Sequence, residues 1–390
     1  MNHHDYYYSY DIKEHQCHFL LGLCSQMKDC ETKTVRRVLP ALQSVFQSPT
    51  VWSINLSERK ASILLEVLKL QSEKKEVVLT GCSDEESEVR SFLQCLPYIS
   101  KLSFPRRSDP DKEIRLLVNL FCAAAEREQQ TGEKILELLS SVCSYETFPF
   151  KDGYMDDQGH FLLDLCSQMK DYETKTDRRV LPALQSVFQS PTVWSINLSK
   201  RKASILLEVL KLQSEKKEVK LTGWSDEESE VRSFLQCLPY ISKLSFPRRS
   251  DRDKEIRFLV NLFCAAAERE QQTGEKILEL LSSVCSYETF PFKERYMDYQ
   301  CHFLLDLCSQ MKDYETKTVR RVLPALQSVF QSPTVWSINL SERKASILLE
   351  VLKLQSEKKE VELTGCSDEE SEVRSFLQCL PYISKLRYFT

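Results

Sequence analysis

The stretch EVVLTGCSDEESEVRSFLQCLPYISKLSF, residues 76–104, decides the fold of this chain. Its first residues alternate with a period of two, which is typical of a half-buried strand. Ser83, followed three residues later by Glu86, predicts a capping box at the start of a helix. Leu102 and Phe104 alternate again, so the stretch predicts a strand, a helix and a second strand.

The whole chain of 390 residues consists of nearly identical copies of this pattern and its surroundings. Trp52, Trp194 and Trp336 lie 142 residues apart, and we expect them to be core residues. Stacked repeats bury their apolar faces only against their neighbours, so we expect one solenoid over 1–390. Its internal copies are 1–142, 143–284 and 285–390, the third incomplete.

Two of these copies can be compared position by position. Residues 18–142 and 160–284 differ at eight positions, which indicates a recent tandem duplication. The differences are Gly22/Asp164, Cys30/Tyr172, Val35/Asp177, Glu58/Lys200, Val78/Lys220, Cys82/Trp224, Pro110/Arg252 and Leu116/Phe258.

Four strands are predicted in each copy, because paired apolar residues recur there at strand spacing. The steps between them are 23, 25, 46 and 48 residues long. The short steps fit the strand-plus-helix unit of a leucine-rich repeat, and the long steps read as strand–helix–helix. Strands joined by helices pair in parallel. We therefore expect an α/β leucine-rich-repeat-like solenoid, with a concave parallel sheet and helices outside. Along the first 142-residue period, counted from Leu56, the pairs are Ile54/Leu56, Val77/Leu79, Leu102/Phe104 and Phe148/Phe150.

Composition excludes several classes of function. The chain is 42% hydrophobic and 28% charged with a net charge of −4, which predicts no nucleic-acid partner. No apolar run approaches the ~18 residues of a membrane span, and no secretory signal begins the sequence, so we expect a cytoplasmic protein without a membrane partner. Only eight glycines occur, without a Gly-rich phosphate loop, and we expect no cofactor.

Cysteine and histidine pairs are the strongest hint of metal or nucleophilic chemistry. Cys17-His18 and Cys301-His302 are adjacent pairs, but Gly159 replaces the cysteine in the second copy. No CxxC spacing is present either. We interpret these residues as helix-surface positions with no ligand role, and expect neither a metal site nor an enzyme.

The outward side of the strands is the candidate binding surface. One position there, between buried neighbours, holds Val78, Lys220 or Glu362 in the three copies, which a core site would not accept. We therefore predict contact with a protein or peptide ligand through the concave face. The residues are Ser53, Asn55, Val78, Thr80, Lys101, Ser103, Ser195, Asn197, Lys220, Thr222, Trp224, Lys243, Ser245, Ser337, Asn339, Glu362 and Thr364.

The motif LQCLPYISKLSF, with the strands EVVLTGC and TVWSINL, resembles the leucine-rich-repeat region of fish NACHT and leucine-rich-repeat (NOD-like) receptors. The resemblance covers essentially the whole chain, and the long units depart from its pattern. It implies cytosolic recognition of a protein ligand in innate immunity. The nucleotide-switch and effector domains of that family are absent from this sequence.

Two other functions remain open. The chain could regulate an enzyme, as GTPase-activating leucine-rich proteins do, or serve as a structural spacer. At the C-terminus, a helix is expected to face Phe376, Leu377 and Leu380 outward, toward a neighbouring repeat, but only a strand follows it and no covering helix. We expect either a fragment of a longer repeat protein, which we favour, or self-association through this end.

The 15 cysteines are predicted to be thiols, because most lie on apolar helix faces and no secretory signal is present. Alkylation under non-reducing, denaturing conditions followed by mass spectrometry should find no native intramolecular disulfide. Two or more reproducible disulfide pairs would contradict the cytosolic assignment.

Overall fold

The computed structural model describes most of the chain. The chain forms two compact units, Met1–Pro191 and Thr192–Thr390. The described residues are 3–34, 37–81, 83, 85–104, 110–144, 148, 155–223, 225–246, 251–286 and 297–388.

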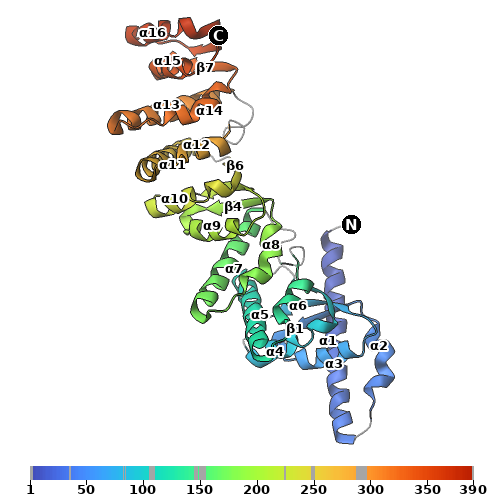
Figure 1. The fold of residues 1–390 in the computed structure, drawn as a ribbon. Helices are drawn as coiled ribbons and strands as arrows, with labels where there is room; N and C mark the ends of the chain where they lie inside the picture. The colour runs from blue at the N-terminus through green and yellow to red at the C-terminus, as the bar shows by residue number, and fades with distance from the viewer. Residues whose placement is uncertain are drawn as a thin grey trace. The chain divides into compact units, whose positions relative to one another are not determined.

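The first unit contains one parallel sheet and eight α-helices within its described residues (Figure 1). Several of these helices and strands are connected by short 3₁₀ helices, labelled η, and all the elements of the unit are given next with their bounds. In chain order they are α1 (His3–Thr34), η1 (Leu39–Leu42), α2 (Gln43–Gln47), β1 (Val51–Asn55), η2 (Leu56–Glu58), α3 (Ala61–Lys69), β2 (Lys75–Gly81), α4 (Glu86–Leu93), η3 (Leu96–Tyr98), β3 (Ile99–Ser103), α5 (Pro110–Thr131), α6 (Ile135–Val142), α7 (Met155–Thr176), η5 (Leu181–Leu184) and α8 (Gln185–Gln189).

The second unit repeats this order and contains two sheets. Its elements are β4 (Val193–Asn197), η6 (Leu198–Lys200), α9 (Ala203–Lys211), β5 (Lys217–Gly223), α10 (Glu228–Leu235), η7 (Leu238–Tyr240), β6 (Ile241–Ser245), α11 (Arg252–Thr273), α12 (Ile277–Val284), α13 (Met297–Thr318), η9 (Leu323–Leu326), α14 (Gln327–Gln331), β7 (Val335–Asn339), η10 (Leu340–Glu342), α15 (Ala345–Lys353), β8 (Lys359–Gly365), α16 (Glu370–Leu377), η11 (Leu380–Tyr382) and β9 (Ile383–Tyr388).

The predicted α/β class with parallel strands is confirmed, but the strands form three small sheets instead of one. Their orders are β1-β2-β3, β4-β5-β6 and β7-β8-β9. After each of the first two sheets the chain continues as helices: α6 packs against β3, and α12 packs against β6.

The fourth strand predicted in each copy lies almost entirely outside the described residues. Phe148 alone is described, in a bend. Its ring is buried, and its centroid lies 5.6 Å from that of Phe104, so this segment contributes to the core.

The core lies where the strand pattern predicts it. Trp52, Trp194 and Trp336 are completely buried, which confirms their prediction as core residues. Helices lie beside the strands in each repeat; α15 and α16, for example, pack side by side next to the last sheet (Figure 1). Every helix among the described residues is too short or too polar to cross a membrane.

The predicted capping box is wrong. The N-cap of α4 is Glu85, and its side chain makes no capping hydrogen bond. The Ser83 hydroxyl accepts a hydrogen bond from the Glu85 backbone N–H at 3.1 Å, which stabilises the turn before the helix. A side chain of α4 is instead used at the start of another helix.

A buried glutamate of α4 caps the start of α3, the helix that precedes α4 in the chain. Glu88 Oε1 on α4 accepts a hydrogen bond from the Ala61 backbone N–H, the first residue of α3, at 2.5 Å. A helix N-terminus has unpaired N–H groups and a positive dipole end, both of which favour a carboxylate. The contact recurs as Glu230 with Ala203 at 2.7 Å and Glu372 with Ala345 at 2.6 Å.

The pH dependence of this cap can be predicted for Glu230. Desolvation raises the pKa of its carboxyl above the ordinary value of 4.5, although backbone hydrogen bonds from Ala203 and Lys202 lower it. The folded state therefore binds the proton more tightly than the unfolded state. The contribution of this group to stability falls as pH rises from 4.5 through the higher folded pKa.

We expect Glu230→Gln to gain stability relative to the native chain as pH rises through that window, because it keeps an acceptor oxygen without the buried charge. Glu230→Ala should cost about 1–3 kcal/mol at every pH, since the buried N–H of Ala203 loses its partner. Urea unfolding at several pH values measures both differences. A glutamine variant as unstable as the alanine variant at neutral pH would contradict this account.

Candidate functional site

The strand register gathers the predicted binding residues into rows on one face of each sheet. Ser53 pairs with Val78, and Val78 pairs with Ser103, so the three form one row across the first sheet. The corresponding row of the second sheet is Ser195, Lys220 and Ser245. In the third sheet it is Ser337, Glu362 and Arg387. Each row belongs to its own three-stranded sheet.

Several predicted residues are too deeply buried to contact a partner as described. The first strand of each sheet carries one of them: Ser53, Ser195 and Ser337 are 6%, 0% and 2% exposed. At β1 and β7 the reason is a helix packed against the edge strand, α1 and α13 respectively. Val78 and Thr80 in the first sheet are buried as well, at 1% and 3%.

The position of Val78 is more accessible in the other two sheets. Lys220 and Glu362 are half-buried there, whereas Val78 is buried. The remaining predicted residues are exposed or half-buried, and Trp224 lies outside the described residues. They are Asn55, Lys101, Ser103, Asn197, Thr222, Lys243, Ser245, Asn339 and Thr364.

The three asparagines have a structural role in addition to their place on this face. The Asn55 carboxamide oxygen accepts hydrogen bonds from the Ser57 N–H at 3.0 Å and the Ser57 hydroxyl at 2.7 Å, which caps η2. A Cβ atom at Gly81 would lie 2.0 Å from this oxygen. Glycine is therefore needed at the end of β2, and Asn197 and Asn339 repeat the arrangement with Gly223 and Gly365.

The sequence analysis missed an acidic residue in a neighbouring row. Glu76 pairs with Lys101 in register, and its Oε1 atom lies 3.8 Å from the Lys101 Nζ and 3.1 Å from the Ser103 hydroxyl. Glu218 with Lys243 and Glu360 with Lys385 repeat the ion pair at 3.8 Å. Glu76 lies two residues before Val78, so following the period-two pattern one position further toward the N-terminus would have identified this glutamate. These exposed pairs are each worth less than about 1 kcal/mol.

The cysteines of the Cys–His pairs on α1 and α13 are not surface residues, which corrects that part of our interpretation, whereas His18 and His302 are half-buried. Cys17 and Cys301 are both 2% exposed, and each packs against an edge strand. The Cys301 thiol donates to the Val335 carbonyl at 3.6 Å and accepts from the Ser337 N–H at 3.3 Å. Cys17 donates to the Val51 carbonyl at 3.5 Å. These thiols supply partners to backbone groups that an edge strand leaves open.

The shifted pKa values of the described thiols are raised, whereas a nucleophilic cysteine has a lowered pKa. Burial raises the pKa of Cys24 to about 11 and that of Cys95 to about 12, so both stay protonated at neutral pH. No disulfide joins the cysteines that the structure describes. Within that same part of the chain, no group of three or more His, Cys, Asp or Glu side chains could hold a metal ion.

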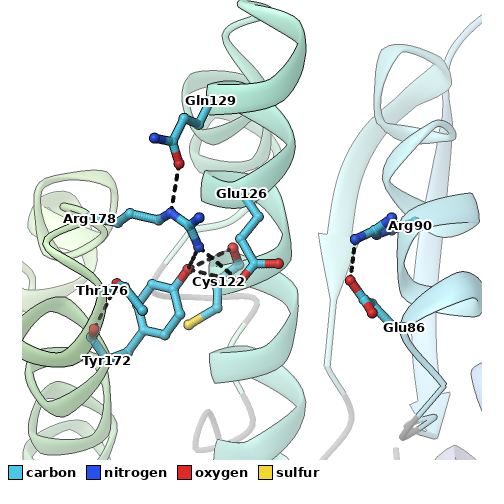
Figure 2. A network of polar contacts seen from close by, with 8 residues as sticks. All are labelled: Glu86, Arg90, Cys122, Glu126, Gln129, Tyr172, Thr176 and Arg178. Atoms are coloured by element: carbon cyan, nitrogen blue, oxygen red, sulfur yellow. Dashed lines mark hydrogen bonds and ion pairs between the residues drawn. The ribbon is translucent and has the colours of Figure 1, made fainter.

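A cluster of polar side chains connects α7 and the residues that follow it to α5 (Figure 2). Arg178 donates to the Gln129 Oε1 at 2.8 Å, to the Glu126 Oε1 at 3.1 Å and to the Tyr172 hydroxyl at 3.2 Å. The Tyr172 oxygen also lies 3.4 Å from the Cys122 carbonyl oxygen. Tyr314, Arg320, Glu268 and Gln271 repeat the cluster between α13 and α11. Its groups hydrogen-bond to one another, so we interpret it as a connection between helices.

No family model, curated protein or solved structure matches this chain.

The first prediction from this site concerns the variable position. The double exchange Lys220→Glu and Glu362→Lys should lower the melting temperature by less than about 5 °C. Both side chains are half-buried, and the main cost is the like charge that a lysine at position 362 would meet in register at Arg387. Differential scanning calorimetry measures the change. A larger fall would show that this face is the packed one.

The second prediction tests the contact between Asn197 and Gly223. Gly223→Ala should cost about 1–2 kcal/mol, because its Cβ would displace the asparagine that caps η6. Gly22→Ala is the matched control: no atom lies within 4 Å of its added Cβ, and alanine favours the helix, so it should stabilise by up to about 1 kcal/mol. Equal effects at both positions in chemical unfolding would contradict the described contact.

Proposed function

We propose that this chain is a non-catalytic protein-binding module, a leucine-rich-repeat-like solenoid that recognises a protein or peptide through the outward faces of its sheets. A continuous solenoid over 1–390 is part of this proposal, as is a cytoplasmic location. On the resemblance stated above, the module is the recognition region of an innate-immune receptor-like protein.

One observation carries the proposal. The centre of the row in each sheet is Val78, Lys220 or Glu362, whereas the serine paired with it on the preceding strand is the same in all three. The second and third sheets thus offer a half-buried basic and a half-buried acidic centre, each beside a serine on the preceding strand, whereas the apolar centre of the first sheet is buried. Different centres on repeated frames suit a surface that reads an extended ligand step by step.

The surrounding chemistry supports binding instead of catalysis. The described thiols with shifted pKa values are held protonated by burial, and the row residues are serines, charged side chains and an aliphatic one. A catalytic site needs a nucleophile or base placed beside an orienting group. The rows offer instead side chains that can form ion pairs and hydrogen bonds with a partner.

A capture experiment with matched charge reversals tests this function. The immobilised chain is compared with Lys220→Glu and Glu362→Lys, using cytosolic extract and quantitative mass spectrometry. Lys216→Glu and Glu357→Lys are the controls, since each makes the same charge change at an exposed position in the loop before the same strand. We expect specifically captured proteins to fall about tenfold with the row variants, equivalent to about 1.4 kcal/mol, and to stay unchanged with the controls.

Two outcomes would contradict the proposal. If row and control variants capture the same proteins equally well, the outward faces of the second and third sheets do not bind the partner. If no protein is enriched over empty beads, the structural-spacer alternative gains support.

A further inference from the structure

The last repeat of the second unit presents an apolar face that its counterparts bury. Leu377 at the end of α16 is 54% exposed, Leu380 in η11 is 43% exposed, and Leu386 in β9 is 45% exposed. Their counterparts one repeat earlier, Leu235, Leu238 and Leu244, are at most 1% exposed. Phe376 is only 5% exposed, so our expectation that it would face outward is wrong.

The structure shows twice what covers this face. In the second unit α11 packs against α10, and α12 packs against both η7 and β6. In the first unit α5 packs against α4, and α6 packs against η3 and β3 in the same way. The covering element is therefore a long helix followed by a short one, and it is the same in two separate units.

The covering helices have the apolar pattern that this role requires. Ile256, Leu259 and Phe263 of α11 are buried at helical spacing, and Ile277, Leu281 and Val284 do the same on α12. Asp251 caps the first helix by accepting a hydrogen bond from the Lys254 N–H at 3.2 Å. Residues 251–286 thus contain two amphipathic helices, the first of which is capped by Asp251.

We propose that the apolar face formed by α16, η11 and β9 docks a pair of amphipathic helices with the chemistry of α11 and α12. This surface is distinct from the outward faces of the sheets and does not depend on their function. The exposed leucines would pack against the long helix as Leu235 packs in the preceding repeat, and the short helix would lie along β9 as α12 lies along β6.

A second copy of the chain fits this face less well. Antiparallel pairing of β9 with itself would bring the Lys385 and Arg387 side chains of two copies close together, and like charges on paired strands are destabilising. A helix pair avoids this repulsion. It also covers the leucines of α16 and η11, which a paired strand would not reach.

Binding of a synthetic peptide of residues 251–286 to the full chain tests the proposal. We expect one peptide per chain by calorimetry, with slower backbone hydrogen exchange in 373–388. Leu377→Glu should weaken binding at least tenfold, because a charge would be buried without a partner. The control Val319→Glu changes another exposed apolar residue, 91% exposed, and should leave the affinity unchanged.

The peptide needs its own control and an alternative presentation. A peptide with Leu259→Glu and Phe263→Glu should not bind. If the free peptide does not fold, residues 247–286 joined directly after Tyr388 test the same contact at high effective concentration. Hydrogen exchange in 373–388 should then slow relative to the unextended chain, and Leu377→Glu should reverse the change.

Three results would overturn the proposal. One is the absence of both peptide binding and added protection in the extended chain. Another is equal weakening by Leu377→Glu and Val319→Glu. The third is a dimer of the chain alone in light scattering that Leu377→Glu dissociates and excess peptide does not, which would identify a second copy as the occupant.

Discussion

The buried glutamate that caps the helix of the preceding step is the interaction on which each repeat depends. Glu88, Glu230 and Glu372 are each 7% exposed, and each accepts a hydrogen bond from the first residue of a neighbouring helix. A buried carboxylate without such a partner would be costly. The first N–H groups of the capped helix would also lack one, since no side chain of its own N-cap residue serves them. The glutamate therefore ties α4 to α3, and its counterparts tie α10 to α9 and α16 to α15.

The three sheets follow the order of short and long steps along the chain. A short step ends in a strand that pairs with the preceding one, and the glutamate holds the two helices beside each other. A long step brings in α5 and α6, or α11 and α12, and the shorter helix packs on the edge strand. Within the described residues the first two sheets contain three strands each, with α6 packed against β3 and α12 against β6. Repetition alone did not reveal this arrangement.

Much of the architecture could be predicted from the sequence, because period-two alternation around Trp52 and Val77 is a local signal. The parallel pairing followed from helical connections. The caps could not be predicted in the same way: the partner of Ala61 is Glu88, 27 residues away, and local spacing favoured Ser83 instead. Ser53 and Ser337 were assigned to an open face for a similar reason. Their burial depends on helices packed against edge strands, which alternation within a strand does not report.

Divergence between the copies shows how strongly packing constrains this chain. Among the differences whose two members the structure describes, Leu116/Phe258 is the one pair buried in both copies, and it exchanges one apolar residue for another. Exposed pairs such as Glu58/Lys200 change charge, as solvated positions can. Val78/Lys220 differs from both kinds, because it lies at the centre of a row whose neighbouring serines stay the same. Val78 is buried where Lys220 and Glu362 are half-buried, so the same position of the row is packed in the first sheet and can carry a charge in the other two.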